Sequence, residues 1–406
     1  MIQSGDTAFI LISAALVLLM TPALALFYAG MVRSKNVLGT IMQSIIMISL
    51  ITLEWIYIGY SMSFGPDVAG LVGSMTHFAL AGVGTAPSPD YATTVPHIVF
   101  MIYQCMFAVI TPALITGAFA ERVRFLPFIC FSVLWSVLVY NPVCHWIWGG
   151  GFLADMGVLD FAGGLVVHLT CGVAALVACI VIGPRKGFGK RSFIPHNLPM
   201  TVIGTGLLWF GWFGFNGGSA LAANEIAATA FVATHIAGMT GMLTWTLVEW
   251  YHSGKPTTLG ACSGAIAGLA TITPAAGFVG PNSAVIIGFM GGLVCYLAVL
   301  AKNRFGYDDS LDVVGIHGMG GLVGTIALGI FASTAINPAG ADGLIFGNPS
   351  FLLTQFMGIG VVGGYTLVVS WIILKAINAI SPLRMEDNDE EIGMDTSEHS
   401  ESAYQA

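Results

Sequence analysis

Charged side chains are scarce in this chain. Its 406 residues include 13 Lys and Arg and 21 Asp and Glu, so that 8% of the chain is charged, whereas soluble domains carry about 25%. Hydrophobic residues make up 56% of the chain. A soluble globular fold cannot use such a composition, and the sequence therefore predicts an all-α polytopic membrane protein.

The chain also lacks the signatures of several chemistries. Its seven cysteines form no CxxC pair and lie mostly in apolar runs, which argues against a disulfide framework and a zinc site. These cysteines are Cys105, Cys130, Cys144, Cys171, Cys179, Cys262 and Cys295. No GxxxxGK[ST] loop is present, and no nucleophile and base stand out as a pair. We therefore expect no ATP-driven pump, no enzyme, no cofactor and no nucleic-acid partner.

Runs long enough to cross a bilayer are abundant. A spanning helix needs about 20 apolar residues, and eleven runs fit this requirement, although the eighth is short. They lie near residues 7–31, 38–64, 95–120, 124–141, 161–183, 198–217, 226–251, 258–274, 282–301, 312–332 and 350–379. The segment MIQSGDTAF before the first run has no basic residue, which argues against a cleaved signal peptide. We expect the first span to stay in the membrane.

The basic residues test this map of spans. All 13 follow an odd-numbered span or lie at its end, and the other connections contain none. They are Arg33, Lys35, Arg122, Arg124, Arg185, Lys186, Lys190, Arg191, Lys255, Lys302, Arg304, Lys375 and Arg384. Because cytoplasmic connections are enriched in Lys and Arg, we predict an external N-terminus and a cytoplasmic C-terminus.

Eleven spans divide into five, five and one. Consecutive units with an odd number of spans insert with opposite orientation, as in the inverted repeats of many transporters. We therefore predict a transmembrane domain over residues 1–380, with inverted repeats near 7–183 and 198–332 and an extra helix near 350–379.

Two histidines lie deep inside the fifth and tenth spans, His168 and His317. A charged group in the middle of a bilayer costs about 2.5 kcal/mol or more, so such a side chain tends to face a cavity or a partner. Each histidine is on the last helix of its repeat, and each helix begins near an aspartate, Asp160 or Asp312. We predict that the imidazoles meet at the midplane. The alternative is two unrelated histidines, each bonded to a helix neighbour.

Aromatic side chains gather toward the predicted outer ends of several spans. Tyr103 and Phe107 are four residues apart and share a helix face. The external connection after the fourth span contains Trp146 and Trp148, and the sixth span contains Trp209, Trp212, Phe213 and Phe215, followed by Ser219. Packing is the usual role of such residues, but their convergence favours a site for a small cation, which aromatic faces attract. For Asp160 we expect an N-cap role first, with support of a nearby cation as a compatible second role.

Residues 381–406 form an acidic tail with eight acids and one base. A tail of this kind is usually solvated and mobile. The alternative is a docking segment for a cytoplasmic partner.

Seven segments of the chain carry a pattern beyond composition and charge. They are FYAGMVRSKNVL (27–38), GAFAERVRF (117–125), DFAGGLVVHLTCGVAALVACIVIGPR (160–185), PHNLPM (195–200), GWFGFNGGS (211–219), GACSGAIAGLATITPAAGFVG (260–280) and DVVGIHGMGGLVG (312–324). These segments resemble the Amt/Mep/Rh ammonium transporters, and the bacterial Amt branch in particular, and the resemblance extends over nearly the whole chain.

This resemblance implies a role for each matching residue. Phe107, Trp148 and Ser219 match an external recruitment site for ammonium, which Asp160 supports. Phe107 and Phe215 match a phenyl gate, Trp212 a pore-lining aromatic, and His168 and His317 a hydrogen-bonded imidazole pair in an apolar pore. The resemblance also implies a homotrimer in the cytoplasmic (inner) membrane, with methylammonium as an analogue substrate. The tail resembles a regulatory segment beside the docking surface of a trimeric PII signalling protein.

Four positions depart from the usual family pattern. Tyr103 stands where phenylalanine is common in the recruitment site and adds a hydroxyl, and Ser400 stands where glycine is frequent in the tail. Glu54 and His235 are polar where the family is often apolar. For these two we expect partners at a subunit interface or at the outer membrane boundary, rather than a functional role.

The leading hypothesis is transport in which ammonium loses its proton outside and neutral ammonia crosses the pore, because an intact cation is costly to desolvate. The proton could travel along the imidazoles, which makes transport electrogenic, or return outside, which makes the protein an ammonia channel. One rival class is an ammonium sensor that signals through its tail. Another is a redox protein with a haem between the two histidines.

Overall fold

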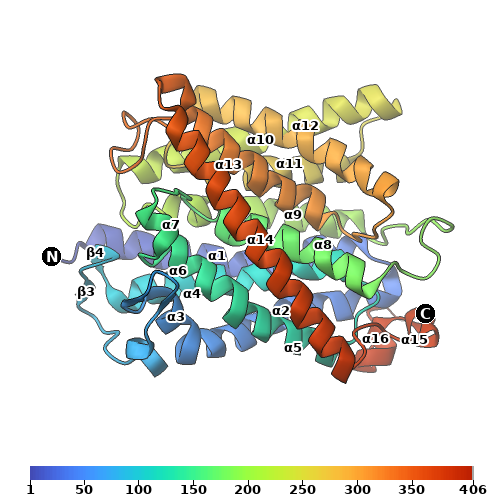
Figure 1. Ribbon diagram of the computed structural model, residues 1–406. Helices are drawn as coiled ribbons and strands as arrows, with labels where there is room; N and C mark the ends of the chain where they lie inside the picture. Colours follow the sequence, from blue (N-terminus) through green and yellow to red (C-terminus); the bar gives the residue numbers. More distant parts are fainter. Residues whose placement is uncertain (405–406) are drawn as a thin grey trace.

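The computed structural model describes residues 1–404, and helices that run side by side make up most of it (Figure 1). The α-helices are α1 (Ser4–Met31), α2 (Val37–Glu54), α3 (Tyr60–Phe64), α4 (His97–Ile115), α5 (Phe125–Trp135), α6 (Asn141–Trp148), α7 (Phe152–Asp155), α8 (Thr170–Ile182), α9 (Leu198–Trp212), α10 (Glu225–Ser253), α11 (Thr258–Ile272), α12 (Pro281–Phe305), α13 (Met319–Phe331), α14 (Pro349–Ile380), α15 (Asp387–Ile392) and α16 (Met394–His399).

Shorter elements interrupt or connect these helices. The π-helical turns are η2 (Trp55–Gly59), η5 (Ser136–Tyr140), η6 (Gly164–Leu169), η7 (Phe213–Gly217) and η8 (Val314–Gly318). The 3₁₀ turns are η1 (Ser34–Asn36), η3 (Met75–Leu80), η4 (Thr116–Phe119) and η9 (Leu344–Phe346). The strands β1 (Asp67–Val68) and β2 (Val72–Gly73) form one antiparallel pair, and β3 (Pro87–Ser88) and β4 (Ala92–Pro96) form another.

The helices confirm the predicted all-α polytopic membrane fold. Ten helical segments in residues 1–404 are long and apolar enough to cross a membrane, and α11 is a shorter apolar helix between the seventh and ninth of the predicted spans. Most of α11 is buried among its neighbours. Because little of it faces lipid, it does not need the full length of a spanning helix.

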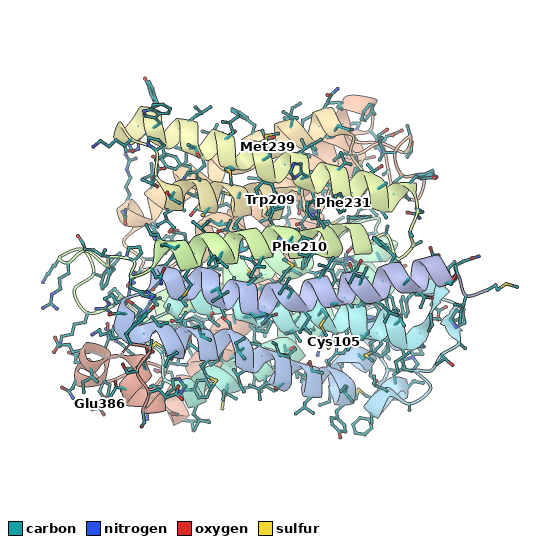
Figure 2. The ribbon with its side chains drawn as sticks, turned by 180° about the vertical axis from the view of Figure 1, so that it is seen from behind. Cys105, Trp209, Phe210, Phe231, Met239 and Glu386 are labelled. Atoms are coloured by element: carbon teal, nitrogen blue, oxygen red, sulfur yellow. The ribbon has the colours of Figure 1, made fainter. Side chains whose placement is uncertain are left out.

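The helix α14 crosses the molecule obliquely (Figure 1). It packs against α5 and α8 from the first half of the chain and against α13 from the second. The extra helix beyond the two predicted repeats therefore joins both halves. On the opposite face, α9 and α10 expose apolar side chains, among them Phe210, Phe231 and Met239 (Figure 2).

Three of the five π-helical turns carry residues singled out from the sequence. His168 lies on η6, Phe215 on η7 and His317 on η8. A π-turn widens the helix by one residue and is frequent at functional sites. Because each turn contains an extra residue, the three side chains point in directions that the period of a regular α-helix does not predict.

Glycine allows two helical segments to touch beside the histidines. A Cβ on Gly172 would lie 2.1 Å from Cα of Gly318, so that α8 and η8 pack backbone against backbone. Helices in membranes associate through such close contacts of small residues. The crossing brings His168 and His317 together from distant parts of the chain.

The acidic tail packs against the body of the protein. Asp395 accepts a hydrogen bond from the backbone N–H of Gly39 at 2.9 Å, and Glu398 accepts one from Phe125 at 2.8 Å. Glu390 binds the backbone N–H of Lys186 at 2.6 Å and is 1% exposed. The commoner expectation, a freely solvated tail, is therefore wrong for Glu390, Asp395 and Glu398, because their donors lie at the starts of α2 and α5 and on the connection after the fifth span. Residues 405–406 lie outside the described part.

Candidate functional site

A cavity of about 420 Å³ lies at the predicted outer end of the helices. Phe107, Trp148, Asp160 and Ser219 are among the residues that line it. The rings of Phe107 and Trp148 meet edge to face with their centroids 6.0 Å apart. Four of the residues predicted for recruitment are thus brought together, and two aromatic faces and a hydroxyl suit a small cation.

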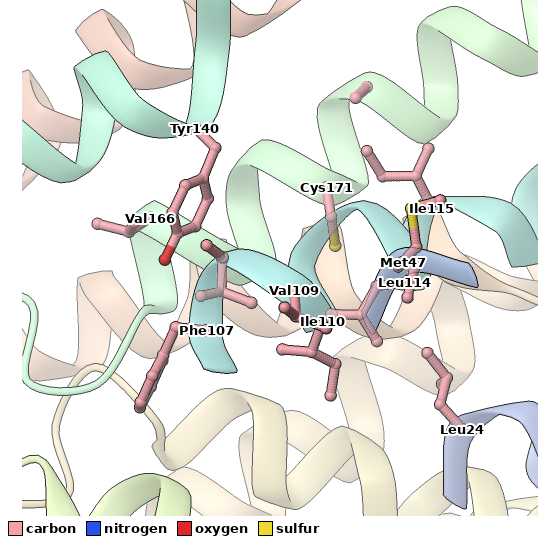
Figure 3. Packing of buried hydrophobic residues seen from close by; sticks show 14 of the residues in the cluster. Leu24, Met47, Phe107, Val109, Ile110, Leu114, Ile115, Tyr140, Val166 and Cys171 are labelled. Atoms are coloured by element: carbon pink, nitrogen blue, oxygen red, sulfur yellow. The ribbon is translucent and has the colours of Figure 1, made fainter. Parts of the chain in front are cut away.

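The floor of this cavity is closed by two phenyl rings. The centroids of Phe107 and Phe215 are 4.3 Å apart, and each residue is 1% exposed. Figure 3 shows Phe107 in its apolar surroundings, with Val109 and Ile110 following it on α4. In this conformation a molecule the size of water cannot pass between the rings, so these residues have the geometry of a closed gate.

Asp160 holds the start of η6. Its carboxylate accepts hydrogen bonds from the backbone N–H groups of Gly163, Gly164, Leu165 and Val166 at 2.7 to 3.0 Å. Burial raises the pKa of this carboxyl above its usual range, although the four N–H donors favour its charged form. The carboxylate satisfies the free donors of the helix start, which is the role expected of an N-cap residue.

Below the gate, the two imidazoles face each other. Nδ1 of His168 and Nδ1 of His317 are 3.3 Å apart, and the rings are nearly parallel, with an interplanar angle of 18°. Trp212 stacks on His168 with a centroid distance of 5.6 Å, and its indole N–H donates to Thr273 at 2.9 Å. The alternative of two unrelated histidines is therefore wrong.

The space beside the histidines is narrow and apolar. The cavity there has a volume of about 10 Å³, close to the minimum for one water molecule. Apart from His168 and His317, its lining is Met20, Leu24, Phe27, Ile110, Leu114, Leu208, Trp212, Phe215 and Ile266. Nε2 of His168 is buried and has no hydrogen-bond partner in residues 1–404. A small neutral molecule with hydrogen-bonding capacity fits this space, and a hydrated cation does not.

Tyr103 occupies a different place from the one expected. It is fully buried, and its hydroxyl lies 3.0 Å from the carbonyl oxygen of Gly214, 2.9 Å from that of Phe215 and 3.3 Å from Oγ of Ser219. It is not among the residues that line the outer cavity. The phenol therefore binds the segment that carries Phe215 and Ser219, and it does not line the cavity itself.

The partners of Glu54 are also different from those expected. Its carboxylate accepts hydrogen bonds from Asn141 at 2.7 Å and from Ser136 at 3.2 Å, both in the same chain. Glu54 therefore has partners within its own subunit, at the predicted outer end of the fourth span, and a position at the outer membrane boundary stays a prediction. His235 lies exposed on α10 beside Trp209, with ring centroids 5.5 Å apart.

Sequence reasoning missed the carboxylate that caps η8. The carboxylate of Asp309 accepts from the backbone N–H groups of Val313 and Val314 at 3.1 and 2.8 Å, as Asp160 does at η6. Asp312, the residue singled out from the sequence, instead forms an ion pair with Lys302. The run DDSLD offers three aspartates and a serine as candidate caps, so the sequence alone does not single out Asp309.

An ion network at the predicted cytoplasmic side was also missed. Glu121 pairs with Arg33 at 3.0 Å and with Arg185 at 3.1 Å, and Arg185 pairs with Asp308 at 2.8 Å. Burial alone would raise the pKa of Glu121, but the guanidinium groups of Arg185 and Arg33 hold it below its usual range. Arg33 and Arg185, two of the basic residues from which the orientation was predicted, therefore also link four connections through ion pairs.

An aromatic cavity, a closed phenyl gate and a narrow passage with paired imidazoles, set in a polytopic helical fold, define a membrane transport protein. A model of the ammonium transporter family matches residues 8–404. The chain belongs to the ammonium transporter family. The members of this family are transport proteins and not enzymes.

The chain is similar to named relatives over nearly its whole length. It is 51% identical over 404 residues to an ammonium transporter of Bacillus subtilis, which covers 99% of each protein. It is 47% identical over 402 residues to the ammonium transporter Amt1 of Archaeoglobus fulgidus, with 99% of this chain and 100% of the relative covered.

Solved structures have the same fold. The crystal structure of Saccharomyces cerevisiae Mep2 superposes with a TM-score of 0.90 at 37% identity, over 96% of this chain and 89% of Mep2. A structure described as a sensor Amt protein superposes with a TM-score of 0.89 at 26% identity, over 97% of this chain and 98% of that one.

Proposed function

We propose that this protein transports ammonium by separating it from its proton. Ammonium enters the outer cavity, where the rings of Phe107 and Trp148 and the hydroxyl of Ser219 replace part of its water shell. The cation cannot follow into the apolar passage without a large desolvation cost. It therefore passes a proton to water in the outer cavity, above or at the gate, and neutral ammonia moves past Phe215; the proton then returns outside or crosses along the histidines.

The observation that carries this proposal is the pair of imidazoles at 3.3 Å in a passage of almost no free volume. The Nδ1–H of one imidazole donates to Nδ1 of the other, so one proton lies in the hydrogen bond between the two rings. Such a pair offers ammonia a hydrogen-bond partner in an otherwise apolar wall, and it offers the proton a place to move. Histidine is suited to either task because its reference pKa is near 6.5.

The pore has a proposed orientation in the membrane, a proposed oligomeric state and a proposed regulatory tail. The distribution of basic residues supports an external N-terminus and a cytoplasmic C-terminus in the inner membrane, with inverted repeats near 7–183 and 198–332. The exposed apolar face of α9 and α10 suits contacts within a homotrimer (Figure 2). The tail, docked on cytoplasmic connections, supports a regulatory role for residues 381–406 and a nearby surface for a PII signalling protein.

The test is a current measurement on proteoliposomes after an ammonium jump, in parallel with a fluorescent measurement of internal pH. We expect a transient current in the wild-type protein, because we favour proton transfer along the histidines. A rise in internal pH without net charge movement would exclude electrogenic transport and would indicate a neutral ammonia channel. No response of either kind would overturn transport.

His168→Ala and His317→Ala extend this test. Removing either imidazole opens the passage and deletes the shared proton, so we expect a potassium current that the wild-type protein does not carry. A variant that still conducts ammonium and still excludes potassium would show that the pair does not select what enters.

The second candidate function is ammonium sensing, which the likeness to the sensor Amt protein favours. A sensor would bind ammonium without moving it, and it would report through its tail. Retained ammonium binding with no methylammonium or ammonium uptake would favour this function. Uptake that is merely reduced by deletion of residues 381–406 would favour a regulated transporter.

A further inference from the structure

His145 is a fully buried histidine on α6, and the proposed mechanism does not use it. Both of its ring nitrogens have an oxygen partner. Nδ1 lies 3.0 Å from the carbonyl oxygen of Ser63, and Nε2 lies 2.8 Å from Oδ1 of Asp67. Because a carbonyl oxygen can only accept a hydrogen bond, Nδ1 carries a proton.

The state of Asp67 decides whether Nε2 carries a proton as well. Oδ2 of Asp67 accepts the backbone N–H of Gly70 at 2.9 Å, and the side chain is 41% exposed. The hydrogen bonds from His145 and Gly70 hold the pKa of Asp67 below its usual range. Asp67 is therefore ionised at neutral pH, and an ionised carboxylate can only accept. Nε2 must donate too, so the ring carries two protons and a positive charge.

The other titratable groups around α6 are not partners of this ring. They are Glu54 on α2, Tyr60 on α3, Tyr91 before β4, Tyr140 on η5, Cys144 on α6, Asp155 on α7, Asp160 before η6, His168 on η6 and Tyr365 on α14. Within residues 1–404, the side chain of His145 binds Ser63 and Asp67. The charge of the imidazole therefore depends on its pair with Asp67.

The pair joins the connection after α3 to the segment that carries Trp148. Two further hydrogen bonds join the same two segments. The indole N–H of Trp146 donates to the carbonyl oxygen of Leu71 at 2.8 Å, and the backbone N–H of Phe152 donates to that of Gly70 at 3.0 Å. The connection after α3 therefore holds the segment on both sides of Trp148.

Trp148 in turn lines the outer cavity. Its indole N–H donates to the carbonyl oxygen of Asp160 at 2.7 Å, and its ring meets the ring of Phe107. It follows His145 by three residues on α6, and the carbonyl oxygen of His145 accepts the N–H of Gly149 at 3.0 Å. The place of the indole at the cavity therefore depends on where His145 is held.

We propose that His145, doubly protonated and paired with Asp67, is a positioning residue that holds Trp148 at the recruitment site. This inference rests on the proposed function. The pair needs both charges, so it is lost in acid when Asp67 takes up a proton and in alkali when Nε2 gives up its proton. A neutral ring turns the lone pair of Nε2 toward the carboxylate, which repels it. The segment around Trp148 then loosens, and ammonium is recruited less tightly.

Nitrogen NMR of the protein with isotope-labelled histidine tests the charge directly. His145 should show two protonated ring nitrogens at pH 7, and its signal is assigned by its absence in His145→Gln. His77 is the internal control, because its Nδ1 lies 2.9 Å from the carbonyl oxygen of Ala81 and a neutral ring satisfies this contact. A neutral His145 at pH 7 would overturn the proposal, whatever the protein transports.

Two variants of Asp67 separate the charge from the contact. Asp67→Ala removes the acceptor and should raise the half-saturation concentration for ammonium about two- to fivefold, as expected for a half-exposed ion pair, with the maximal rate unchanged. Asp67→Asn offers an NH₂ group to Nε2 of a neutral ring, so it keeps the contact without the charge. It should keep the wild-type half-saturation concentration at pH 7, and NMR should show one protonated nitrogen on His145.

The pH profile links these two readouts. In the wild-type protein, the half-saturation concentration, counted as ammonium, should rise over the pH range in which NMR shows Nε2 losing its proton. Asp67→Asn should lack this rise. A wild-type half-saturation concentration that does not respond to the loss of the proton would show that the pair has no part in recruitment.

Asp155→Ala is the matched control, because Asp155 is an exposed acid of α7 that forms no ion pair in residues 1–404. It removes the same charge and should leave the half-saturation concentration unchanged. An equal rise in the two alanine variants would indicate a general effect of charge and overturn the positioning role. A wild-type protein that moves no ammonium would overturn the proposed function, whereas the NMR result would still report the charge of His145.

Discussion

Single side chains organise the entrance of the proposed pore through backbone groups. The carboxylate of Asp160 binds four N–H groups at the start of η6, and His168 lies on the same short element. The hydroxyl of Tyr103 does the equivalent for η7, where it binds the carbonyl oxygens of Gly214 and Phe215. In both cases a polar group away from the passage fixes the direction of a residue that lines it.

Asp160→Asn tests this role. An amide has one acceptor oxygen where a carboxylate has two. Its NH₂ group would face backbone N–H donors, so only some of the four hydrogen bonds to the start of η6 can remain. We expect a loss of about 1–2 kcal/mol in stability, as for other capping residues, and at least a tenfold loss of ammonium transport. Thermal unfolding in detergent and uptake into proteoliposomes measure the two effects.

Asp155→Asn is the control for this variant, because Asp155 is an exposed acid on the same connection. It should change neither quantity. Equal stability and transport in Asp160→Asn and the wild-type protein would contradict the capping role.

At the scale of the elements, the sequence predicts the spans well and the local geometry poorly. The thickness of the bilayer sets the length of an apolar span, and Lys and Arg gather in cytoplasmic connections. The spans and the short α11 could therefore be predicted from the sequence. The π-turns under His168, Phe215 and His317 could not, because they arise from contacts between distant segments. The same applies to the hydroxyl of Tyr103, whose partners lie more than a hundred residues away.

Gly172→Ala tests the contact between α8 and η8. The added Cβ would lie 2.1 Å from Cα of Gly318, so the backbones must separate and the imidazoles with them. We expect loss of most ammonium transport and a destabilisation of about 1–3 kcal/mol, as in overpacked cores.

Gly360→Ala is the matched control, since nothing lies within 4 Å of the Cβ that it adds on α14. This variant should keep transport, and its stability should rise slightly because alanine favours the helix by about 1 kcal/mol. If both alanine variants transported ammonium equally, the close contact would not matter for the pore.

At the scale of the whole molecule, buried ions hold the predicted cytoplasmic connections together. Glu121 and Asp308 both have pKa values below their usual range, because Arg185 pairs with each of them. A carboxyl with a lowered pKa in the folded state stabilises the fold at pH values above its unfolded pKa, about 4.3 for Glu. This contribution is lost as the pH falls through the folded pKa.

Glu121→Gln should therefore show a pH-dependent deficit. Near pH 7 it should lower stability by about 3–5 kcal/mol, the usual effect of breaking a buried pair. The gap to the wild-type protein should narrow below about pH 4. Thermal unfolding in detergent between pH 7 and pH 3 measures the gap, with the exposed Glu225→Gln as control. A gap that stays constant over this range would contradict the network.

The outer face of the molecule, on the proposed orientation, carries acids and no Lys or Arg. These acids are Asp6, Asp67, Asp90, Asp155, Asp160, Glu225 and Asp342. Asp90 lies at the rim, since it lines both the outer cavity and a neighbouring cavity of about 890 Å³. A surface of one sign raises the local concentration of oppositely charged ions, and clefts focus this effect.

External salt should therefore weaken the apparent affinity for ammonium. The Debye length falls from about 30 Å at 0.01 M to about 8 Å at 0.15 M, so the acids beyond the rim cease to act on an approaching cation. We expect the half-saturation concentration to rise about two- to fivefold over this range, with the maximal rate unchanged. A bulky organic salt, such as N-methylglucamine chloride, avoids competition inside the cavity, and sucrose controls for osmolarity. Asp90→Asn should reduce the salt dependence, whereas the same salt added inside the vesicles should have no effect. A half-saturation concentration independent of external salt would show that recruitment depends only on the contacts within the cavity.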